Sequence, residues 1–462
     1  MPPQPPPRVA AIEHPGESAS NAIRRQLAAV EPRALRTFTP SLAVFSSAEG
    51  CYVYTPEGRR LADFTSGVLV ANLGHNPSRW WRRVTDYMGL SDLSTTEEFL
   101  PAAPLTAYNA VTPLETQACE RLLALMRAQP GGERMEQVMW SASGSEGVIK
   151  ALRTALAQDP RRQTILATRH GFHGKKGLAG AVTGSEQDPD RDGRVRFISF
   201  PQDECSSLAR RRQPLDVAPF AAELEALDEK LGDRLCCLVT EPYLGGGGSY
   251  HPQPEYLRLL QRFCRERNLV FILDEVQSNF GRTGEMFAYT TYGLEPDLVV
   301  LGKGLGNGVP VDCVVGRADL MAKLNYGEVS DTWIGHPLGC AAVLATIDEF
   351  AEQDVLANAR ALAATLEAGL TRLADLPAVH AVRGEGTVWG VECAAIGSHD
   401  STEVAREFVR ACYLGDSEGR AVHLLGPLAG NVIRVAPPLV MPPIEAQQAL
   451  DAMFACAQAI SH

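Results

Sequence analysis

Short apolar runs alternate with amphipathic segments through the middle of this 462-residue chain, roughly from residue 90 to residue 340. Each run is short and continuous, which is typical of a β-strand that is buried on both faces of a sheet. Strands of this kind are expected at 137–140, 164–168, 235–240, 269–273 and 298–301, and helices at 114–126, 146–157, 221–231 and 255–267. Such alternation predicts an α/β fold with a largely parallel, doubly wound sheet.

The segments on either side of this region predict a smaller α+β domain. Before it, residues 50–64 form two β-rich arms around a Pro-Glu-Gly turn, which indicates a hairpin. The elements expected after it are a long helix at 339–373 that is interrupted near Asp354, strands at 386–391 and 432–435, and a terminal helix from Pro443.

These segments divide the chain into four parts. Residues 1–20 are expected to be a disordered, proline-rich tail, and residues 86–340 the large domain. Residues 21–85 and 341–462 are expected to form the small domain together, so that both chain ends build it. Within the large domain, the charged and proline-punctuated stretch 186–216 is expected to be an excursion on the surface.

Composition narrows the class of partner. The net charge is −12, whereas nucleic acids and anionic membranes reward a basic surface, so neither is an expected partner. No run approaches the roughly 20 apolar residues that span a bilayer, and the proline-rich start lacks the apolar core of a signal peptide. The eleven cysteines show neither CxxC pairs nor metal-ligand spacing, which indicates reduced thiols, a cytoplasmic protein and no bound metal.

Two of the apolar runs end in residues that suggest a chemistry. Asp274 closes the run Val-Phe-Ile-Leu, and Lys303 follows the run Val-Val-Leu-Gly. Open α/β sheets bind ligands beyond the carboxyl ends of their strands, so both side chains are expected at one rim. Pyridoxal phosphate requires such a pair, a lysine for the Schiff base and an acid for the pyridinium nitrogen.

The loops after the other strands are consistent with this cofactor. Ser143, Gly144 and Ser145 precede a helix, where free amides and the positive helix end can hold a phosphate, although such residues are more often a simple cap. Phe172 could cover a planar ring, although an ordinary buried phenylalanine is the commoner case, and Glu241 adds a second acid. Each signal is weak alone, but their order along consecutive strands supports one site.

Two long segments carry a resemblance to a known family. They are DEVQSNFGRTG at 274–284 and PDLVVLGKGLGNGVP at 296–310, supported by NLGHNP at 72–77 and IRVAPPL at 433–439. In this order they closely resemble the class III (ω-type) aminotransferases. The resemblance implies fold type I, with a large mixed, mostly parallel sheet domain of the seven-stranded type and a smaller α+β domain.

The resemblance also implies a role for each site residue. Lys303 would carry pyridoxal 5'-phosphate and shuttle the proton, and Asp274 would keep the ring nitrogen protonated. The other cofactor contacts would be Ser143, Gly144, Ser145, Phe172, His173, Glu241, Val276 and Gln277, with Phe172 and Val276 on opposite ring faces and Gln277 on the phenolic oxygen. Thr332 would reach the phosphate of a neighbouring subunit, which implies a homodimer with shared active sites.

Several positions depart from the family pattern: Ile149 stands for a usual Glu, Leu244 for a frequent Gln, and His336 for an Asn. Lys175 stands where members that bind an α-carboxylate often have Arg, and lysine lacks the planar fork that grips a carboxylate. Lysine at position 175 therefore favours a donor with a terminal amine; the alternative is that Lys175 only faces solvent. Arg434 would bind the oxo acid carboxylate, and Glu241 would pair with Arg434 when the other substrate is present, unless the two form a permanent bridge.

The predicted function is a ping-pong transfer of an amino group from an amine, diamine or ω-amino acid to a 2-oxo acid such as pyruvate or 2-oxoglutarate. An aminomutase or a decarboxylase on the same scaffold is the alternative, since the cofactor serves all three reactions. A non-catalytic binding protein is disfavoured because Lys303 and Asp274 are both present. A nicotinamide enzyme is disfavoured because no GxGxxG follows a strand and opens a helix.

Overall fold

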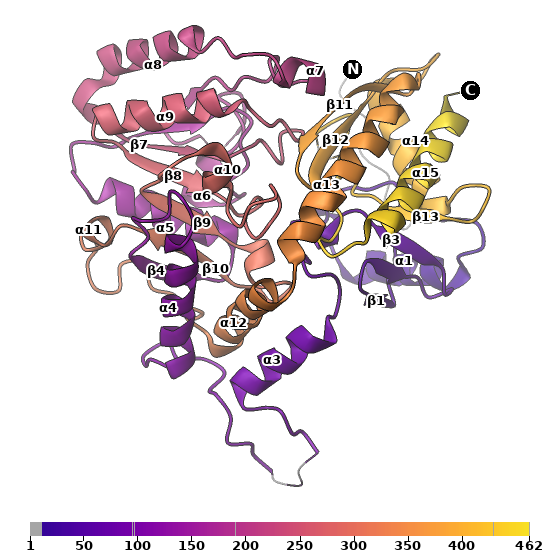
Figure 1. The fold of residues 1–462 in the computed structure, drawn as a ribbon, viewed down its shortest axis with the longest axis horizontal. Coiled ribbons are helices and arrows are strands. Elements are labelled where there is room, and N and C mark those ends of the chain that lie inside the picture. Colours follow the sequence, from indigo (N-terminus) through magenta and orange to yellow (C-terminus); the bar gives the residue numbers. More distant parts are fainter. Residues whose placement is uncertain (1–11, 95, 97, 190, 428, 462) are drawn as a thin grey trace.

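The large domain is built around one mixed sheet of seven strands in the order β4-β10-β9-β8-β7-β5-β6 (Figure 1). The computed structural model describes residues 12–94, 96, 98–189, 191–427 and 429–461. The strands are β4 (Gln137–Ser141), β5 (Thr164–Thr168), β6 (Val195–Ile198), β7 (Leu235–Thr240), β8 (Val270–Asp274), β9 (Leu298–Leu301) and β10 (Asp312–Gly316). All neighbours from β9 to β6 pair in parallel, and β10 is antiparallel to both β4 and β9. The expected mostly parallel sheet is confirmed.

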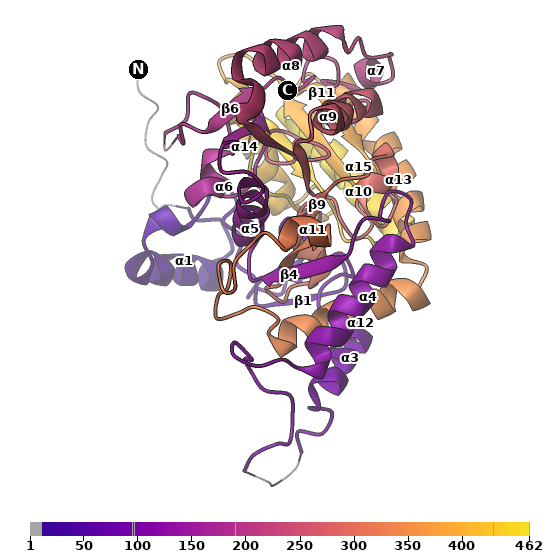
Figure 2. The same ribbon diagram turned by 90° about the vertical axis from the view of Figure 1, so that its left-hand side faces the viewer.

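Both faces of this sheet are buried, which explains why its strands read as continuous apolar runs. Alternate residues of β8 enter different cores: Phe271 and Leu273 pack with one helix layer, Val270 and Ile272 with the other. The first layer contains α3 (Ser78–Met88), α4 (Pro113–Arg127), α8 (Ala218–Leu231), α9 (Pro254–Glu266), α10 (Ala288–Tyr292) and α12 (Pro337–Glu352). The second contains α5 (Gly144–Leu156), α6 (Gly177–Ala181) and α11 (Ala318–Met321), and Figure 2 shows α5 and α6 on their own side of the sheet.

Two strands of the sheet were not expected. β6 lies inside the stretch 186–216, so the prediction of a plain surface excursion there is wrong. β6 is the edge strand of the sheet, so it pairs with one strand only, β5. Its sequence, Val-Arg-Phe-Ile, is short and contains a charged residue, so it lacks the continuous apolar run of the inner strands. β10 holds a charged residue, Asp312, at its start, which hides an otherwise apolar run.

The smaller region contains two sheets. In one, β1 (Ser47–Glu49), β2 (Tyr52–Tyr54) and β3 (Arg60–Asp63) form antiparallel pairs, and β13 (Ala421–His423) joins β3 in parallel. The other is antiparallel, with β11 (Val379–Glu385), β12 (Val388–Cys393) and β14 (Val432–Val435). The helices of the smaller region are α13 (Val355–Thr371), α14 (Ser401–Leu414) and α15 (Pro443–Ile460), together with the 3-10 turn η5 (Arg372–Asp375). Strands from both chain ends thus share one sheet, and the predicted hairpin and terminal helix are present.

The limits of the predicted parts differ from the packing in two places. The helix expected at 339–373 is broken at 353–354, as predicted, but α12 packs into the core of the large sheet, so a boundary at 340 cuts through it. Residues 1–11 lie outside the described residues, whereas His14, Glu17 and Ser20 are buried and α1 (Ser18–Val30) begins within the predicted tail. The prediction of a disordered tail over residues 12–20 is therefore wrong.

The remaining short elements are η2 (Arg33–Leu35), α2 (Ser66–Leu69), α7 (Leu208–Arg211), η3 (Gly232–Arg234) and η4 (Lys303–Leu305). α2 is left-handed: Ser66, Gly67, Val68 and Leu69 all have φ between 49° and 70°. Left-handed turns are costly for residues with a side chain, above all for a β-branched valine, so the surrounding structure must hold this one. It leads directly to Val70, at the cavity described below.

Among the described residues, none of the helices combines the length and the apolar character that crossing a membrane requires.

Candidate active site

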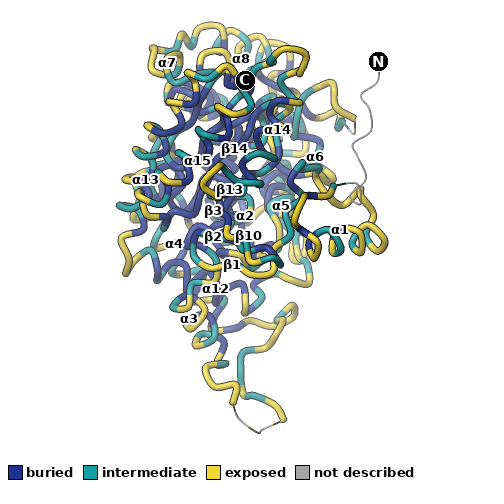
Figure 3. The backbone as a smooth tube through the Cα atoms, turned by 90° about the vertical axis from the view of Figure 1, so that its right-hand side faces the viewer, coloured by how far each residue is buried: buried dark blue, intermediate teal, exposed yellow. Residues whose placement is uncertain are grey.

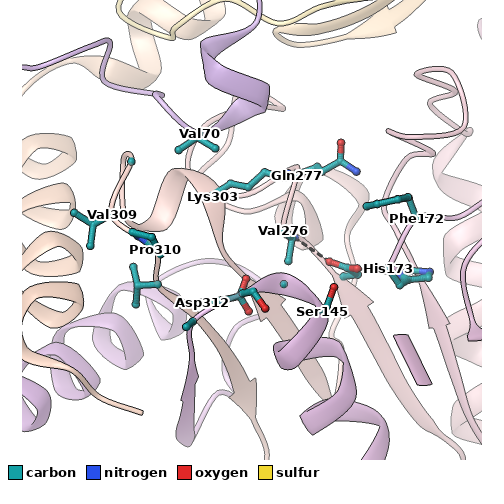
Figure 4. Close-up of a pocket in the computed structure, with 17 residues that line it drawn as sticks. Val70, Ser145, Phe172, His173, Val276, Gln277, Lys303, Val309, Pro310 and Asp312 are labelled. Atoms are coloured by element: carbon teal, nitrogen blue, oxygen red, sulfur yellow. Dashed lines mark hydrogen bonds and ion pairs between the residues drawn. The ribbon is translucent and has the colours of Figure 1, made fainter. Parts of the chain in front are cut away.

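A cavity of about 360 Å³ opens at the edge of the large sheet where its parallel strands end (Figure 4). Ligands of open α/β sheets bind at this edge. The predicted residues that line it are Ser143, Gly144, Ser145, Phe172, His173, Asp274, Val276, Gln277 and Lys303. They come from the loops after β4, β5, β8 and β9, so the strand-end argument brought together residues that are far apart in the sequence.

Asp274 is held firmly in this cavity. One oxygen accepts a hydrogen bond from the backbone amide of Val276 at 3.0 Å, and the other lies 2.8 Å from His173 Nδ1. Burial disfavours the charged form of His173, but the hydrogen bond and charge of Asp274 outweigh it and raise the pKa of His173 above its ordinary value. His173 Nε2 has no hydrogen-bond partner among the described residues. The pair therefore presents a carboxyl group that is held in place by the Val276 amide and by a buried imidazole.

Lys303 sits directly after β9 in a strained conformation. Its φ is +50°, in the left-handed region that residues with a side chain rarely adopt, and such strain is concentrated at functional sites. The preceding carbonyl, of Gly302, accepts a hydrogen bond from Asn279 Nδ2 at 3.1 Å, which helps to hold the turn. Burial, and then the positive charge of Arg434, lower the pKa of the Lys303 amine. An amine of this kind is available as a nucleophile and as a proton carrier.

The start of helix α5 forms another wall of the cavity. Gly144 and Ser145 are its first two residues, where amide groups have no partner within the helix. The Ser143 side chain makes no capping hydrogen bond, so this serine is not an ordinary helix cap. Free amides and the positive end of the helix suit an anion such as a phosphate.

Glu241, Gln277 and Arg434 form a chain of contacts behind the cavity. Gln277 Nε2 donates to Glu241 at 2.9 Å, and Arg434 donates to Gln277 Oε1 at 3.2 Å and to the Gly245 carbonyl at 2.5 Å. Glu241 also accepts from the Phe172 amide at 2.8 Å. Glu241 and Arg434 form no direct ion pair among the described residues, because Gln277 lies between them, so the alternative of a permanent bridge is not supported.

Burial sets the protonation of both ends of this chain. It raises the pKa of Glu241 to about 7, with the nearby charges of His173 and Asp274 acting in opposite directions. Burial also lowers the pKa of Arg434 from its ordinary value. Near neutral pH the Glu241 carboxyl is therefore present in both its neutral and its charged form. Arg434 has no carboxylate partner among the residues that the structure describes.

Besides Glu241 and Arg434, which lie behind the cavity, two more predicted site residues do not line it. Lys175 is exposed and does not line it. Thr332 is also exposed, on a loop whose Asp331 forms an ion pair with Lys150 at 2.7 Å. Lys150 is buried in α5 and donates to the Trp140 carbonyl as well, so the Thr332 loop is tied to the helix whose first turn lines the cavity.

Asp312 lines the cavity and was missed. The strand-end argument considers the carboxyl ends of parallel strands, but β10 is antiparallel, so its first residue lies at the same edge. The signal that could have found it is a single acid in the apolar sequence Val-Pro-Val-Asp-Cys-Val-Val. Val70, which follows the left-handed turn, is another lining residue that was not predicted.

Comparisons with known proteins agree with this geometry. A family model described as aminotransferase class-III matches residues 36–457. An acetylornithine aminotransferase from Gloeobacter violaceus is 30% identical over 434 residues, which cover 91% of this chain and 95% of the relative. A 4-aminobutyrate aminotransferase from Mycobacterium tuberculosis is 30% identical over 443 residues, covering 93% of each chain. A solved amine transaminase from an uncultivated Pseudomonas species, in its PLP-bound form, shares the fold with a TM-score of 0.75 at 24% identity, covering 97% of this chain and 98% of that one.

Proposed function

Because this chain belongs to the class III aminotransferases, which use pyridoxal 5'-phosphate, we propose that it moves an amino group from an amine, diamine or ω-amino acid to a 2-oxo acid by a ping-pong mechanism. The observation that carries the proposal is one cavity that holds Lys303, Asp274 and the start of α5 together. Pyruvate and 2-oxoglutarate are the proposed acceptors. The alternative of an aminomutase or decarboxylase gains no support, since the relatives named above are transaminases.

The cavity residues fit this cofactor. Ser143, Gly144 and Ser145 would hold its phosphate through the free amides of α5, and Phe172 and Val276 would flank its ring. Gln277 would contact the ring oxygen, with Glu241 behind it. When bound, pyridoxal phosphate supplies a conjugated ring that accepts the electron pair left on the substrate carbon.

Three side chains would manage the protons. Asp274 would hold a proton on the ring nitrogen of the bound cofactor, and His173 orients Asp274 through the contact between them. The amine of Lys303 would be the covalent anchor of the cofactor and, when free, would carry the proton that leaves the substrate α-carbon. The lowered pKa of Lys303 supports both tasks, because more of the amine is neutral at a given pH.

Arg434 is the proposed ligand of the oxo acid carboxylate. It is buried and has no carboxylate partner in the described part of the chain, so an incoming substrate carboxylate would give it one. Swinging Gln277 aside would let Glu241 approach Arg434 when an amine without a carboxylate is bound. The relatives are named for acetylornithine and 4-aminobutyrate, which carry an amine at the end of a chain, and this supports a terminal-amine donor. Lys175 is proposed to contact only the outer part of a long donor.

The direct test pairs a substrate panel with mapping of the anchor. Amines, diamines and ω-amino acids are each tested with pyruvate and 2-oxoglutarate, and the holoenzyme is reduced with borohydride before peptide mapping. We expect transfer with at least one terminal-amine donor, and the cofactor label on Lys303. Lys303→Ala should abolish turnover, and Lys323→Ala should not, since Lys323 lies away from the cavity lining. Carbon dioxide release in place of amino transfer, or a label on another lysine, would overturn the proposal.

We further propose a homodimer in which Thr332 completes the partner's phosphate site. Exposed apolar side chains support an interface on this chain: Leu93, Phe99, Leu105, Tyr108 and Val111 on the arm between α3 and α4, and Trp333 beside Thr332. Figure 3 shows this arm projecting beyond α3 with much of its backbone coloured as exposed. Large exposed apolar surface commonly marks a protein interface, and two-fold dimers are the commonest oligomer.

Mixing two inactive variants tests the sharing of sites. If Thr332 acts in trans, a dimer of one Lys303→Ala chain and one Thr332→Val chain contains one site with both residues intact. Activity should therefore rise after the two variants are unfolded and refolded together, whereas each refolded alone stays low. An active monomer in light scattering, or no gain on mixing, would contradict the shared site.

We also propose a cytoplasmic location. All eleven cysteines fall within the described residues and are free thiols, which a reducing compartment maintains. Fractionation of cells that produce the protein would test this, and recovery in an oxidising compartment would contradict it.

A further inference from the structure

Asp312 is a buried carboxyl for which the roles above give no use. It is 2% exposed, lines the cavity, and faces the first turn of α5 (Figure 4). Its only hydrogen bond among the described residues is a long one, 3.4 Å from Ser141 Oγ to Oδ1. Its second oxygen, Oδ2, therefore has no partner in the part of the chain that the structure describes. Buried carboxyl groups are normally well hydrogen-bonded, so this one requires an explanation.

The local backbone is shaped to accommodate this side chain. A β-carbon on Gly302, directly before Lys303, would collide with Asp312 Oδ2, and one on Gly147, in α5, would collide with Oδ1. A β-carbon on Gly144 would lie 3.6 Å from Oδ2. The carboxyl thus occupies a slot made by missing side chains, beside the residues that open α5. Its position is set by packing from two elements.

The charges around Asp312 oppose its ionised form. Burial and the negative charge of Asp274 raise the pKa of Asp312 well above its ordinary value, and Glu146 on α5 acts in the same direction. Lys303 is the cation that faces it, and Ser141 on β4 is the polar neighbour that favours its charged form. A phosphate placed at the start of α5 would add further negative charge near this group.

We propose that Asp312 is a further cofactor-binding residue, which donates a hydrogen bond as a neutral carboxyl to the cofactor phosphate, so that cofactor binding takes up one proton. The proton comes from solvent and resides on Oδ2, the oxygen without a partner. The inference rests on the proposed function, since it places the phosphate at the free amides of Gly144 and Ser145. It goes beyond that function because it assigns a proton-linked contact to a residue on an antiparallel strand.

Cofactor retention by the full-length holoenzyme tests the inference without relying on activity. The apparent dissociation constant for pyridoxal phosphate is measured by absorbance after ultrafiltration, from about pH 6 to about pH 9. Asp312→Asn keeps the shape and a donor but cannot ionise, and Asp312→Ala removes the donor. The matched control is Asp319→Asn, which removes the same charge from an exposed position at the start of α11.

One linked proton has a defined signature. Above the ionisation of Asp312, log Kd of the wild type should rise with pH more steeply than that of Asp312→Asn, by a slope difference of about one. The ionisations of the cofactor are common to both proteins and cancel. Asp319→Asn should follow the wild type, and Asp312→Ala should bind more weakly at every pH. With pyridoxal, which has no phosphate, the slope difference should vanish.

Other outcomes would overturn the inference. Identical slopes for the wild type and Asp312→Asn would show that no proton is taken up at this residue. A tenfold or greater loss of affinity in Asp312→Asn at about pH 6 would show that the charged carboxylate is needed, as a partner of Lys303. A slope difference that persists with pyridoxal would move the contact away from the phosphate. Failure of the wild type to bind pyridoxal phosphate at all would instead refute the proposed function.

Discussion

Asp274 and Asp312 lie on either side of β9, line the same cavity and have opposite surroundings. Asp274 has two close partners, the Val276 amide and His173, whereas Asp312 has one long contact with Ser141. The first acid is therefore held in place by its hydrogen bonds before any ligand arrives. The second is a group whose missing partner must be supplied. The comparison suggests that one end of the cavity is preorganised for a positive ring nitrogen and the other is completed by the ligand.

The largest expected effect breaks the preorganised end. Asp274→Asn keeps the shape but removes the charge opposite the ring nitrogen, so kcat/KM should fall by over a hundredfold, about 3 kcal/mol in the barrier. With the cofactor at saturation, the kcat/KM of Asp312→Asn should fall by a smaller factor than that of Asp274→Asn. Steady-state kinetics of the two variants beside Asp319→Asn would measure the difference. A near-normal rate for Asp274→Asn would remove the distinction between the two acids.

A smaller effect separates the two substrates. Arg434 contacts Gln277 and the Gly245 carbonyl, so its charge is free for an oxo acid. Arg434→Ala should raise the KM for the oxo acid by roughly tenfold to a hundredfold, the range for hydrogen bonds to charged groups, and the KM for an amine donor far less. Half-reaction kinetics with each substrate alone would measure this. Equal losses in both half-reactions would identify Arg434 as a structural residue.

Much of the fold and part of the site could be predicted because burial on both sheet faces leaves a continuous apolar signal. β7 and β8 are such strands, and the residues after them meet at one edge for a geometric reason. β6 was not predicted because an edge strand needs less apolar sequence. Asp312 was not predicted as a site residue because the rule for the carboxyl ends of parallel strands does not cover an antiparallel strand. The insertion of Gln277 between Glu241 and Arg434 depends on side-chain packing across three elements, which spacing along the chain does not encode.

The slot around Asp312 can be tested by filling it. Gly302→Ala should destabilise the protein by about 1–3 kcal/mol, because its β-carbon would meet Asp312 Oδ2. In the Asp312→Ala background the same change should destabilise the protein much less. The next neighbour of the added β-carbon would be Val276 Cγ1, at 3.5 Å, which is an ordinary contact. Urea unfolding of the four proteins gives the coupling between the two positions. Additive costs would mean that the carboxyl does not occupy this slot.

The smallest effect sharpens the comparison through the pH dependence of stability. The pKa of Asp312 is raised in the folded protein, mainly by burial, so the folded state holds this proton more tightly than the unfolded state. The stability that this proton contributes is complete below the ordinary pKa of an aspartate, about 3.9, and is lost as the pH rises through the folded pKa. The loss is at most about 1.4 kcal/mol per pH unit for one group. Asp312→Asn has no such loss. Without cofactor, the melting temperature of Asp312→Asn minus that of the wild type should therefore increase as the pH rises from about 5 to about 9. Asp319→Asn should not show this trend, because the hydrogen bond and charge of Arg317 outweigh burial and lower the pKa of the Asp319 carboxyl. A constant difference between Asp312→Asn and the wild type across this range would show that Asp312 is ionised in the folded protein.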